Sequence, residues 1–251
     1  MITSPIFETF TLPSHGKIYD VDVNPRIKLR SMTTMDEMRR LTPSDTPYKA
    51  MSDIIEGCME TPPNIHVYNM ALGDYQFLLH KLRIVTYGPE YKMFIKCKDV
   101  NCGAVSEVIA DLDSLPLREW DQTIIDKALI TLPRSNHEVQ LKFQTARDLD
   151  IISYKNSEMK KRTKQPIDYS ILYTLMSLIK KVDGRVLSEL ELEEFVKNLQ
   201  NKDANYILNR ATELNNAIGL ENVIEATCPE CGAKLIAPFR ITSEFFGPTN
   251  N

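Results

Sequence analysis

The amino-acid sequence predicts an α+β fold that is mostly helical and carries a small β element built from two cysteine hairpins. Segments with apolar residues at helical spacing make up much of the chain. Two cysteine pairs, far apart in the sequence, each lie in a turn beside segments that favour β structure. With 251 residues, of which 43% are hydrophobic and 25% charged, the chain is long enough for one large or two small domains.

The two cysteine hairpins have the spacing of zinc knuckles. Four residues separate Cys97 from Cys102, Pro-Glu separates Cys228 from Cys231, and glycine follows each second thiol. Such a turn bends the chain around an ion, and the glycine lets backbone amides point at sulfur. These four cysteines are therefore the predicted ligands of one structural zinc ion in a zinc-ribbon-like element. The alternative is two unrelated pairs of reduced or disulfide-bonded cysteines.

The first thirty residues favour extended and turn structure. Phe7–Leu12 alternates weakly, Pro13–Gly16 has turn chemistry, and Lys17–Asp22 and Arg26–Leu29 are expected to be extended. His15 lies in the turn, where we expect an exposed side chain.

Three helices are expected next, over residues 33–41, 45–59 and 73–87. The helical spacing of the second places Cys58 on its apolar face, which predicts a core thiol rather than a metal ligand. His80 falls on the polar side of the third helix and is expected to be a solvated surface histidine.

Short β segments flank the thiols. Tyr91–Lys96 and Val105–Ala110 surround the first pair, and Lys234–Phe239 follows the second. Between Cys102 and Cys228 the chain makes an excursion that is too long for a free loop in a compact domain. The excursion must therefore carry structure of its own.

The excursion is predicted to contain one strand and then an antiparallel array of four helices. The strand is Glu138–Phe143, and the helices are expected over residues 145–161, 167–179, 189–199 and 204–218. Lys180 and Lys181 would complement the carboxyl end of the second helix, and Gly184 would cap it. Ser188 begins a capping box for the third helix, and Asp203 is the expected cap of the fourth.

These elements divide the chain into four parts. Residues 1–112 form an amino-terminal α+β unit with the first zinc knuckle, and residues 113–220 form a mainly helical insertion. Residues 221–246 supply the second knuckle and a closing strand. Residues 247–251 are a polar tail that we expect to be disordered.

Composition and charge bound the class of protein. The formal net charge of −4 gives no general attraction to nucleic acid or to an anionic membrane. No run approaches the roughly 18 apolar residues of a membrane span, and the start lacks the features of a secretion signal. Paired cysteines of this kind fit a reducing compartment, so we expect a soluble protein of the cytosol.

No enzyme signature stands out. The sequence has no GxxxxGK[ST] phosphate loop, no GxGxxG after a strand, no GxSxG and no HExxH. The four histidines are scattered, and none lies beside a nucleophile and an orienting partner in a recognisable pattern. We therefore predict a non-enzymatic protein with no catalytic residues.

One basic cluster stands out, between Lys155 and Lys164. Its functional interpretation is a contact with nucleic acid or with an acidic partner, and its structural one is the exposed end of a helix. Aromatic stacking residues are not interleaved in it, which disfavours single-stranded nucleic acid. A nucleic-acid-binding zinc-ribbon protein remains the alternative function.

The combined motifs resemble a known family. A Leu-Pro-Ser-x-Gly-x-x-Tyr sequence spans Leu12–Tyr19, a helix ends in Tyr-Gly-Pro-Glu-Tyr at Tyr87–Tyr91, and a cysteine pair follows shortly after. Over residues 7–110 this is similar to the baseplate hub and hub-assembly proteins of T-even-like contractile-tailed phages. The helical region 145–220 resembles these proteins only in its general character.

The resemblance implies a non-enzymatic protein, made in the host cell cytoplasm, that acts with other baseplate hub proteins. It is either a component of the virion tail baseplate or an assembly factor that the finished particle lacks. A hypothesis for the metal follows. The zinc would fix the geometry between two partner-binding faces, one around Leu12–Tyr19 and one on the helices within 145–218. The alternative is that it only stabilises a small sheet.

Overall fold

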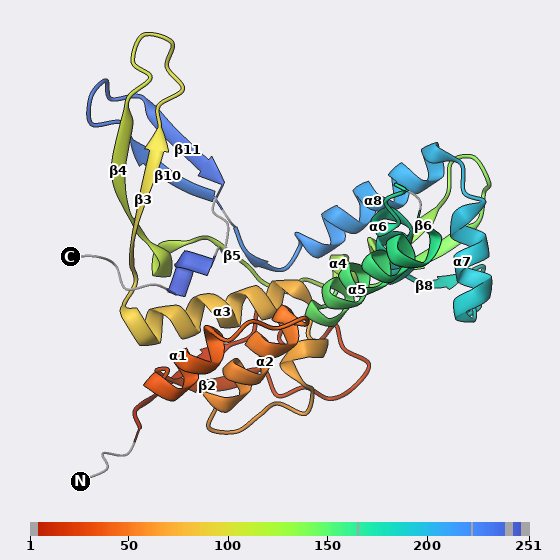
Figure 1. Ribbon diagram of the computed structural model, residues 1–251, viewed down its shortest axis with the longest axis horizontal. Coiled ribbons are helices and arrows are strands. Elements are labelled where there is room, and N and C mark those ends of the chain that lie inside the picture. The colour runs from red at the N-terminus through yellow and green to blue at the C-terminus, as the bar shows by residue number, and fades with distance from the viewer. Residues whose placement is uncertain (1–4, 165, 222, 239–242, 247–251) are drawn as a thin grey trace.

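The computed structural model describes residues 5–164, 166–221, 223–238 and 243–246. The predicted tail, 247–251, lies outside the described residues. Helices take up 41% of the chain, and the strands form small antiparallel sheets, which confirms the α+β fold class. Figure 1 shows two hairpins projecting side by side at one end of the molecule and the helices of the excursion at the other.

The amino-terminal part contains one hairpin-like strand pair and three helices. In order, the elements are β1 (Phe7–Thr11), β2 (Arg26–Arg30), α1 (Thr34–Arg40), α2 (Pro47–Gly57), the 3-10 turn η1 (Val67–Asn69) and α3 (Leu72–Tyr87). β1 and β2 pair antiparallel. A capping box between Thr33 and Asp36 begins α1, because each side chain bonds the other residue's backbone N–H.

Two local expectations in this part are wrong. The segment Lys17–Asp22 forms turns and bends, not a strand. Helix α2 begins at Pro47, not at residue 45, and its first N–H groups at Tyr48 and Lys49 donate to the carboxylate of Asp150. The cap of α2 therefore comes from a residue about a hundred positions away, which local sequence patterns do not reveal.

The two projecting hairpins are formed by the predicted β segments around the thiols. The first pairs β3 (Glu90–Lys96) with β4 (Val105–Asp111), and the second pairs β10 (Val223–Thr227) with β11 (Lys234–Pro238). Phe239, expected to continue the last strand, lies outside the described residues.

The excursion holds more β structure than expected. In order, its elements are η2 (Leu112–Ser114), β5 (Leu117–Arg118), α4 (Thr123–Asp126), β6 (Leu129–Thr131), β7 (Glu138–Leu141), α5 (Ala146–Thr163), α6 (Ser170–Leu178), β8 (Ile179–Val182), α7 (Glu189–Lys197), α8 (Asn201–Asn215) and β9 (Gly219–Leu220). Strands β6, β7 and β8 form one antiparallel sheet, and β5 pairs with β9.

The second helix of the predicted array ends earlier than expected. Helix α6 stops at Leu178, and the next four residues pair with β7 as strand β8, with Val182 opposite Val139. Lys180 and Lys181 are therefore strand residues and do not complement a helix end. Gly184, at φ 75°, turns the chain after β8 and does not cap α6. An apolar run of this length fits either element, and the sheet partner decided between them.

Asp203 is also placed differently. It lies in the first turn of α8, whose cap position is Gln200, and its carboxylate accepts hydrogen bonds from the backbone of Arg134 (2.8 Å) and Ser135 (3.0 Å). The carboxylate thus fixes the turn between β6 and β7. The capping box at Ser188, by contrast, is formed as predicted.

Two hydrophobic clusters fill the interior. The first joins the amino-terminal helices to the hairpins and includes Leu12, Ile27, Leu29, Ile55, Leu78, Leu82, Ile95, Ile224 and Leu235. The second lies within the excursion and includes Leu132, Val139, Leu141, Leu175, Val182, Ile207 and Leu214. Most of these side chains are almost fully buried. Each buried side chain contributes on the order of 2 kcal/mol to the free energy of unfolding.

The junction between the clusters is held at several points away from the thiols. Strands β5 and β9 pair where the excursion leaves and returns. Next to them, a Cβ on Gly73 would lie 2.4 Å from the carbonyl oxygen of Ile218, so only glycine allows this approach. Asp150 of α5 adds its bonds to α2 and accepts another from the Tyr68 hydroxyl at 3.1 Å. The excursion is therefore anchored by direct packing.

The far end of α3 buries a charged and a titratable side chain. Arg83 is fully buried and donates to the carbonyl oxygens of Phe245, Gly88 and Glu90, which holds the turn η3 (Ser243–Phe246) against the helix. His80 was expected at the surface but is 0% exposed, with its ring centroid 5.1 Å from that of Phe245. The segment that covers His80 is far from it in the sequence, so the apolar periodicity of α3 could not reveal this burial.

Burial of His80 predicts a pH-dependent stability. Desolvation, and then the charges of Lys81 and Arg83, lower the pKa of this imidazole from 6.5 to about 4. The unfolded chain therefore binds more protons between these pH values, and stability falls as the pH drops from above 6.5 toward 4. The free energy of unfolding should fall by about 2–3 kcal/mol more in the wild type than in His80→Gln between pH 7 and 4.5.

Urea unfolding at the two pH values measures this difference. His66→Gln is the matched control, because the His66 side chain is 80% exposed, and this variant should behave as the wild type. Equal pH dependence in the wild type and His80→Gln would contradict the assignment.

Candidate metal centre

The four predicted ligands meet at the ends of the two projecting hairpins. The sulfur atoms of Cys97 and Cys231 are 3.7 Å apart, those of Cys102 and Cys228 are 3.9 Å apart, and all four lie within 4.8 Å of one another. A tetrahedral site with metal–sulfur bonds of about 2.3 Å has sulfur–sulfur edges of about 3.8 Å. The cluster therefore has the size needed to bind one metal ion.

The first hairpin turn is shaped by backbone hydrogen bonds. The N–H of Cys97 donates to Ala104 O at 2.7 Å and closes the end of the β3–β4 ladder. The amides of Cys102 and Gly103 both donate to Asp99 O, at 3.1 and 3.2 Å. Gly103 has φ 60°, a left-handed conformation that disfavours residues with a Cβ, which explains the glycine after the second thiol.

The second hairpin turn repeats this arrangement with a shorter spacer. Cys228 N–H donates to Ala233 O at 2.8 Å, and Gly232 N–H donates to Cys228 O at 2.9 Å. Gly232 has φ 73°. Each turn thus presents both of its thiols toward the other hairpin, where β10 contacts β4 and β11 contacts β3.

The electrostatics of the cluster favour a bound cation. Backbone N–H groups of Cys231 and Glu230 point at the Cys228 sulfur and lower the pKa of this thiol to about 7. The Ala233 amide lowers the pKa of Cys231, but desolvation and the three neighbouring thiols raise it to about 12. Four thiols this close cannot all ionise together unless a cation compensates their charge, and thiolates are the form that binds metals.

The fifth cysteine is not part of this cluster. Cys58 is fully buried in the first hydrophobic cluster, and its thiol lies 3.9 Å from the Asp36 carboxylate. Burial raises the pKa of this thiol to about 11. The prediction of a core thiol is confirmed.

The Leu-Pro-Ser loop forms a second cluster of polar contacts, around a residue that the sequence analysis missed. Ser14 donates to the Asp74 carboxylate through its backbone N–H at 3.0 Å and its hydroxyl at 2.5 Å. The Tyr19 hydroxyl donates to the same carboxylate at 2.6 Å and accepts from the backbone N–H of Ala71 at 3.2 Å. The only sequence signal for Asp74 is its place in the first turn of a helix, where acidic residues are common.

The remaining motif residues shape this loop. Leu12 is fully buried, and Gly16 has φ 73° with a Cβ position 2.5 Å from Val23 O, so no other residue fits without a shift. Leu12, Pro13 and Ser14 are all buried. These three residues therefore cannot themselves contact a partner, whereas His15 and Lys17 are exposed, and a partner-binding face around Leu12–Tyr19 stays a prediction. His15 is exposed, as predicted, and its Nε2 lies 3.1 Å from Glu119.

The basic cluster is partly neutralised by acidic neighbours. Lys155 pairs with Glu189, the Lys161 amino group lies 3.4 Å from Glu158, and that of Lys160 lies 4.0 Å from Asp168. The cluster is the exposed carboxyl end of α5. This arrangement matches the structural interpretation of the cluster better than a phosphate-binding surface.

Comparison with known proteins identifies a family. Residues 4–247 match the family model described as T4 bacteriophage base plate protein, which covers nearly the whole chain. The description names the base plate and not its central hub. No curated protein and no solved structure shows significant similarity to this chain. Among the described residues, no helix combines the length and the apolar character that crossing a lipid bilayer requires.

Tyr19→Phe should destabilise the loop that contains it. The change removes the hydrogen bond to Asp74 and the acceptor for Ala71, and leaves a buried carboxylate with fewer donors. We expect a loss of about 1–3 kcal/mol in the free energy of unfolding, measured in urea. Tyr154→Phe, at a residue 64% exposed, is the control and should change little. Equal stabilities of the two variants would contradict the role of Asp74.

Replacing two thiols should remove the metal and spare the body of the protein. We expect elemental analysis of the wild type, purified without chelator, to find one metal ion per chain, and of Cys228→Ser with Cys231→Ser to find none. Far-ultraviolet circular dichroism should stay nearly unchanged, because the helices pack in the two clusters. Cys58→Ala should keep its metal. A metal-free wild type would contradict the site.

Proposed function

This chain belongs to the T4 bacteriophage base plate protein family, and from that premise we propose that it acts in the assembly or structure of the central baseplate hub. The observation that carries the proposal is the family match over residues 4–247. The motifs at Leu12–Tyr19 and Tyr87–Tyr91 add the resemblance to hub proteins. In this proposal the protein is non-enzymatic, its partners are other baseplate hub proteins, and it works in the infected host cell and in the tail baseplate.

We further propose that the bound metal is zinc. The four ligands Cys97, Cys102, Cys228 and Cys231 all offer sulfur, and a tetrahedral set of thiolates favours zinc over oxygen-preferring ions. With four protein ligands the site leaves no open position for a water or a substrate. Its role is then structural.

The zinc would staple the two hairpins together. Each hairpin is a two-stranded sheet, which is marginally stable alone, and the metal joins their ends. The excursion has its own anchors at β5–β9 and at Gly73, so it does not need the metal to hold its position. Of the two roles considered for the metal, the structure therefore favours stabilisation of a small β element over a clamp on the helical array.

The alternative, a nucleic-acid-binding zinc-ribbon protein, has less support. The net charge is −4, and three lysines of the basic cluster lie within 4.0 Å of acidic side chains. If the protein did bind nucleic acid through phosphate contacts, its affinity would fall steeply with added salt. A filter-binding assay at low salt that retained DNA or RNA would revive this alternative.

The assembly role predicts a defect in infected cells. Infection with phage that lack this chain should yield few complete baseplates, seen by sedimentation and electron microscopy, and supplying the wild-type chain should restore them. The Cys228→Ser, Cys231→Ser variant should restore fewer than Cys58→Ala, if the β element contacts a partner. Normal baseplates without the chain would contradict the proposal. Mass spectrometry of purified particles then separates a hub component from an assembly factor.

A further inference from the structure

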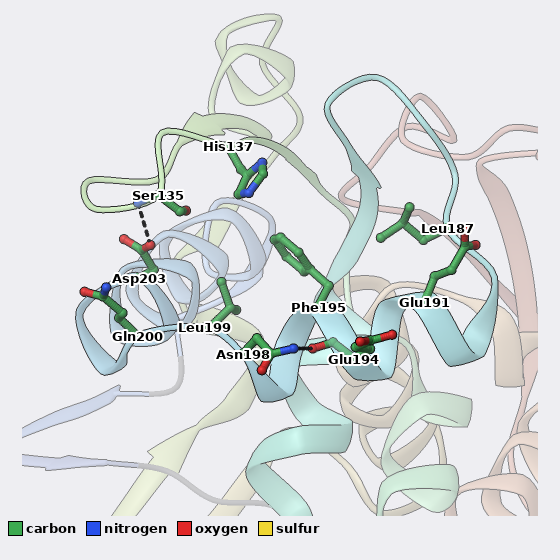
Figure 2. Close-up of a pocket in the computed structure, with 10 residues that line it drawn as sticks. All are labelled: Ser135, His137, Leu187, Glu191, Glu194, Phe195, Asn198, Leu199, Gln200 and Asp203. Atoms are coloured by element: carbon green, nitrogen blue, oxygen red, sulfur yellow. Dashed lines mark hydrogen bonds between the residues drawn. The ribbon is translucent and has the colours of Figure 1, made fainter.

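A pocket of about 430 Å³ opens within the excursion, away from the thiols and from the Leu-Pro-Ser loop. Helix α7, the start of α8 and the turn between β6 and β7 enclose it (Figure 2). Leu187, Phe195 and Leu199 supply its apolar wall, and Glu191 and Glu194 supply carboxylates. Figure 2 shows Phe195 pointing from α7 toward His137, and the two ring centroids are 5.5 Å apart.

The glutamates of α7 are not equivalent. Glu189 pairs with Lys155, and Glu193 lies 2.5 Å from Lys197, so these two are neutralised outside the pocket. Glu194 lines the pocket, and among the ion pairs of the described residues it has no cationic partner. The negative charge of the helix therefore remains uncompensated on the side that faces the pocket.

The other acidic groups of the pocket have their own structural roles. Glu191 closes the capping box with Ser188, and Arg185 approaches it only to 4.0 Å. Both oxygens of Asp203 accept backbone hydrogen bonds from the β6–β7 turn. These bonds fix the walls of the pocket, and Glu194 is the carboxylate left for a ligand.

We propose that this pocket binds an arginine side chain presented by a partner protein. A planar guanidinium can stack on the Phe195 ring while it donates to the Glu194 carboxylate, and its aliphatic stem can lie against Leu187 and Leu199. The occupant is cationic because Glu194 is a lining carboxylate with no cationic partner among the ion pairs of the described residues. The proposal extends the proposed assembly role to a specific contact.

The proposal commits to a partner of different sequence, and a second copy of this chain is an alternative that the test below separates. The basic segment of this chain, Lys155–Lys164, already lies among Glu189, Glu158 and Asp168. Lys155, Lys160 and Lys161 would have to leave these contacts to enter the pocket of another copy. A basic segment of another baseplate protein carries no such cost.

The test uses the full-length protein and two small probes. N-acetyl-arginine methylamide supplies the charged head, and N-acetyl-citrulline methylamide has the same shape without the charge. We expect the arginine probe to shift the NMR signals of the Phe195 and His137 rings in a saturable way, and the citrulline probe to bind about tenfold more weakly. Added salt should weaken the binding of the arginine probe and leave that of the citrulline probe unchanged.

Two variants of α7 make the test specific. Glu194→Gln should weaken the arginine probe about tenfold, whereas Glu193→Gln, the same charge change one residue away and outside the pocket, should not. Equal binding of the two probes, an unchanged affinity in Glu194→Gln, or a chain dimer that Glu194→Gln dissociates would each overturn the proposal. The baseplate-assembly test does not depend on these outcomes, so the pocket can fail while the assembly role stands.

Discussion

Asp74 is a fully buried carboxylate in the first turn of α3, and its oxygens accept hydrogen bonds from Ser14 and Tyr19. The same turn also contacts the excursion. Gly73 lies against the backbone of Gly219, and the backbone N–H of Leu72 donates to Gln144 O at 2.8 Å. A buried carboxylate that lost its donors would carry a large desolvation cost. The first turn of α3 therefore holds the amino-terminal loop and is one of the points that anchor the excursion.

The opposite end of α3 determines where the β element begins. The guanidinium of Arg83 satisfies three carbonyl groups at once, at Gly88, Glu90 and Phe245. Gly88 ends the helix and Glu90 begins β3, so the same side chain links the helix end, the first hairpin and the carboxyl-terminal turn. Burial lowers the pKa of this arginine, and the carbonyl dipoles compensate for the lost water.

The body of the molecule and the tips of the projecting hairpins differ in the interactions available to stabilise them. The body is held by two apolar clusters and a few buried polar contacts, and the projecting hairpins, which join the first cluster through Ile95, Ile224 and Leu235, carry four clustered thiols at their ends. A small exposed β element with little core of its own is the kind of structure that a metal stabilises. The β element and helix α7, which lines the pocket, lie at opposite ends of the molecule (Figure 1).

The sequence by itself determined the features that depend on neighbouring residues. Cysteine spacing with a following glycine specified both hairpin turns, the capping box at Ser188 began α7, and the apolar stripe of α2 placed Cys58 in the core. Within a few residues, hydrogen bonds and side-chain periodicity are set by the chain itself.

Only the tertiary structure decided the features that depend on distant partners. Asp150 caps α2, β7 turns Ile179–Val182 into a strand, and Phe245 covers His80. The family resemblance drew attention to Leu12–Tyr19, but the role of that segment became clear only beside Asp74. The physical reason is common to all four: a polar group or an ambiguous apolar run takes the structure that its partner offers, and the partner lies far away in the sequence.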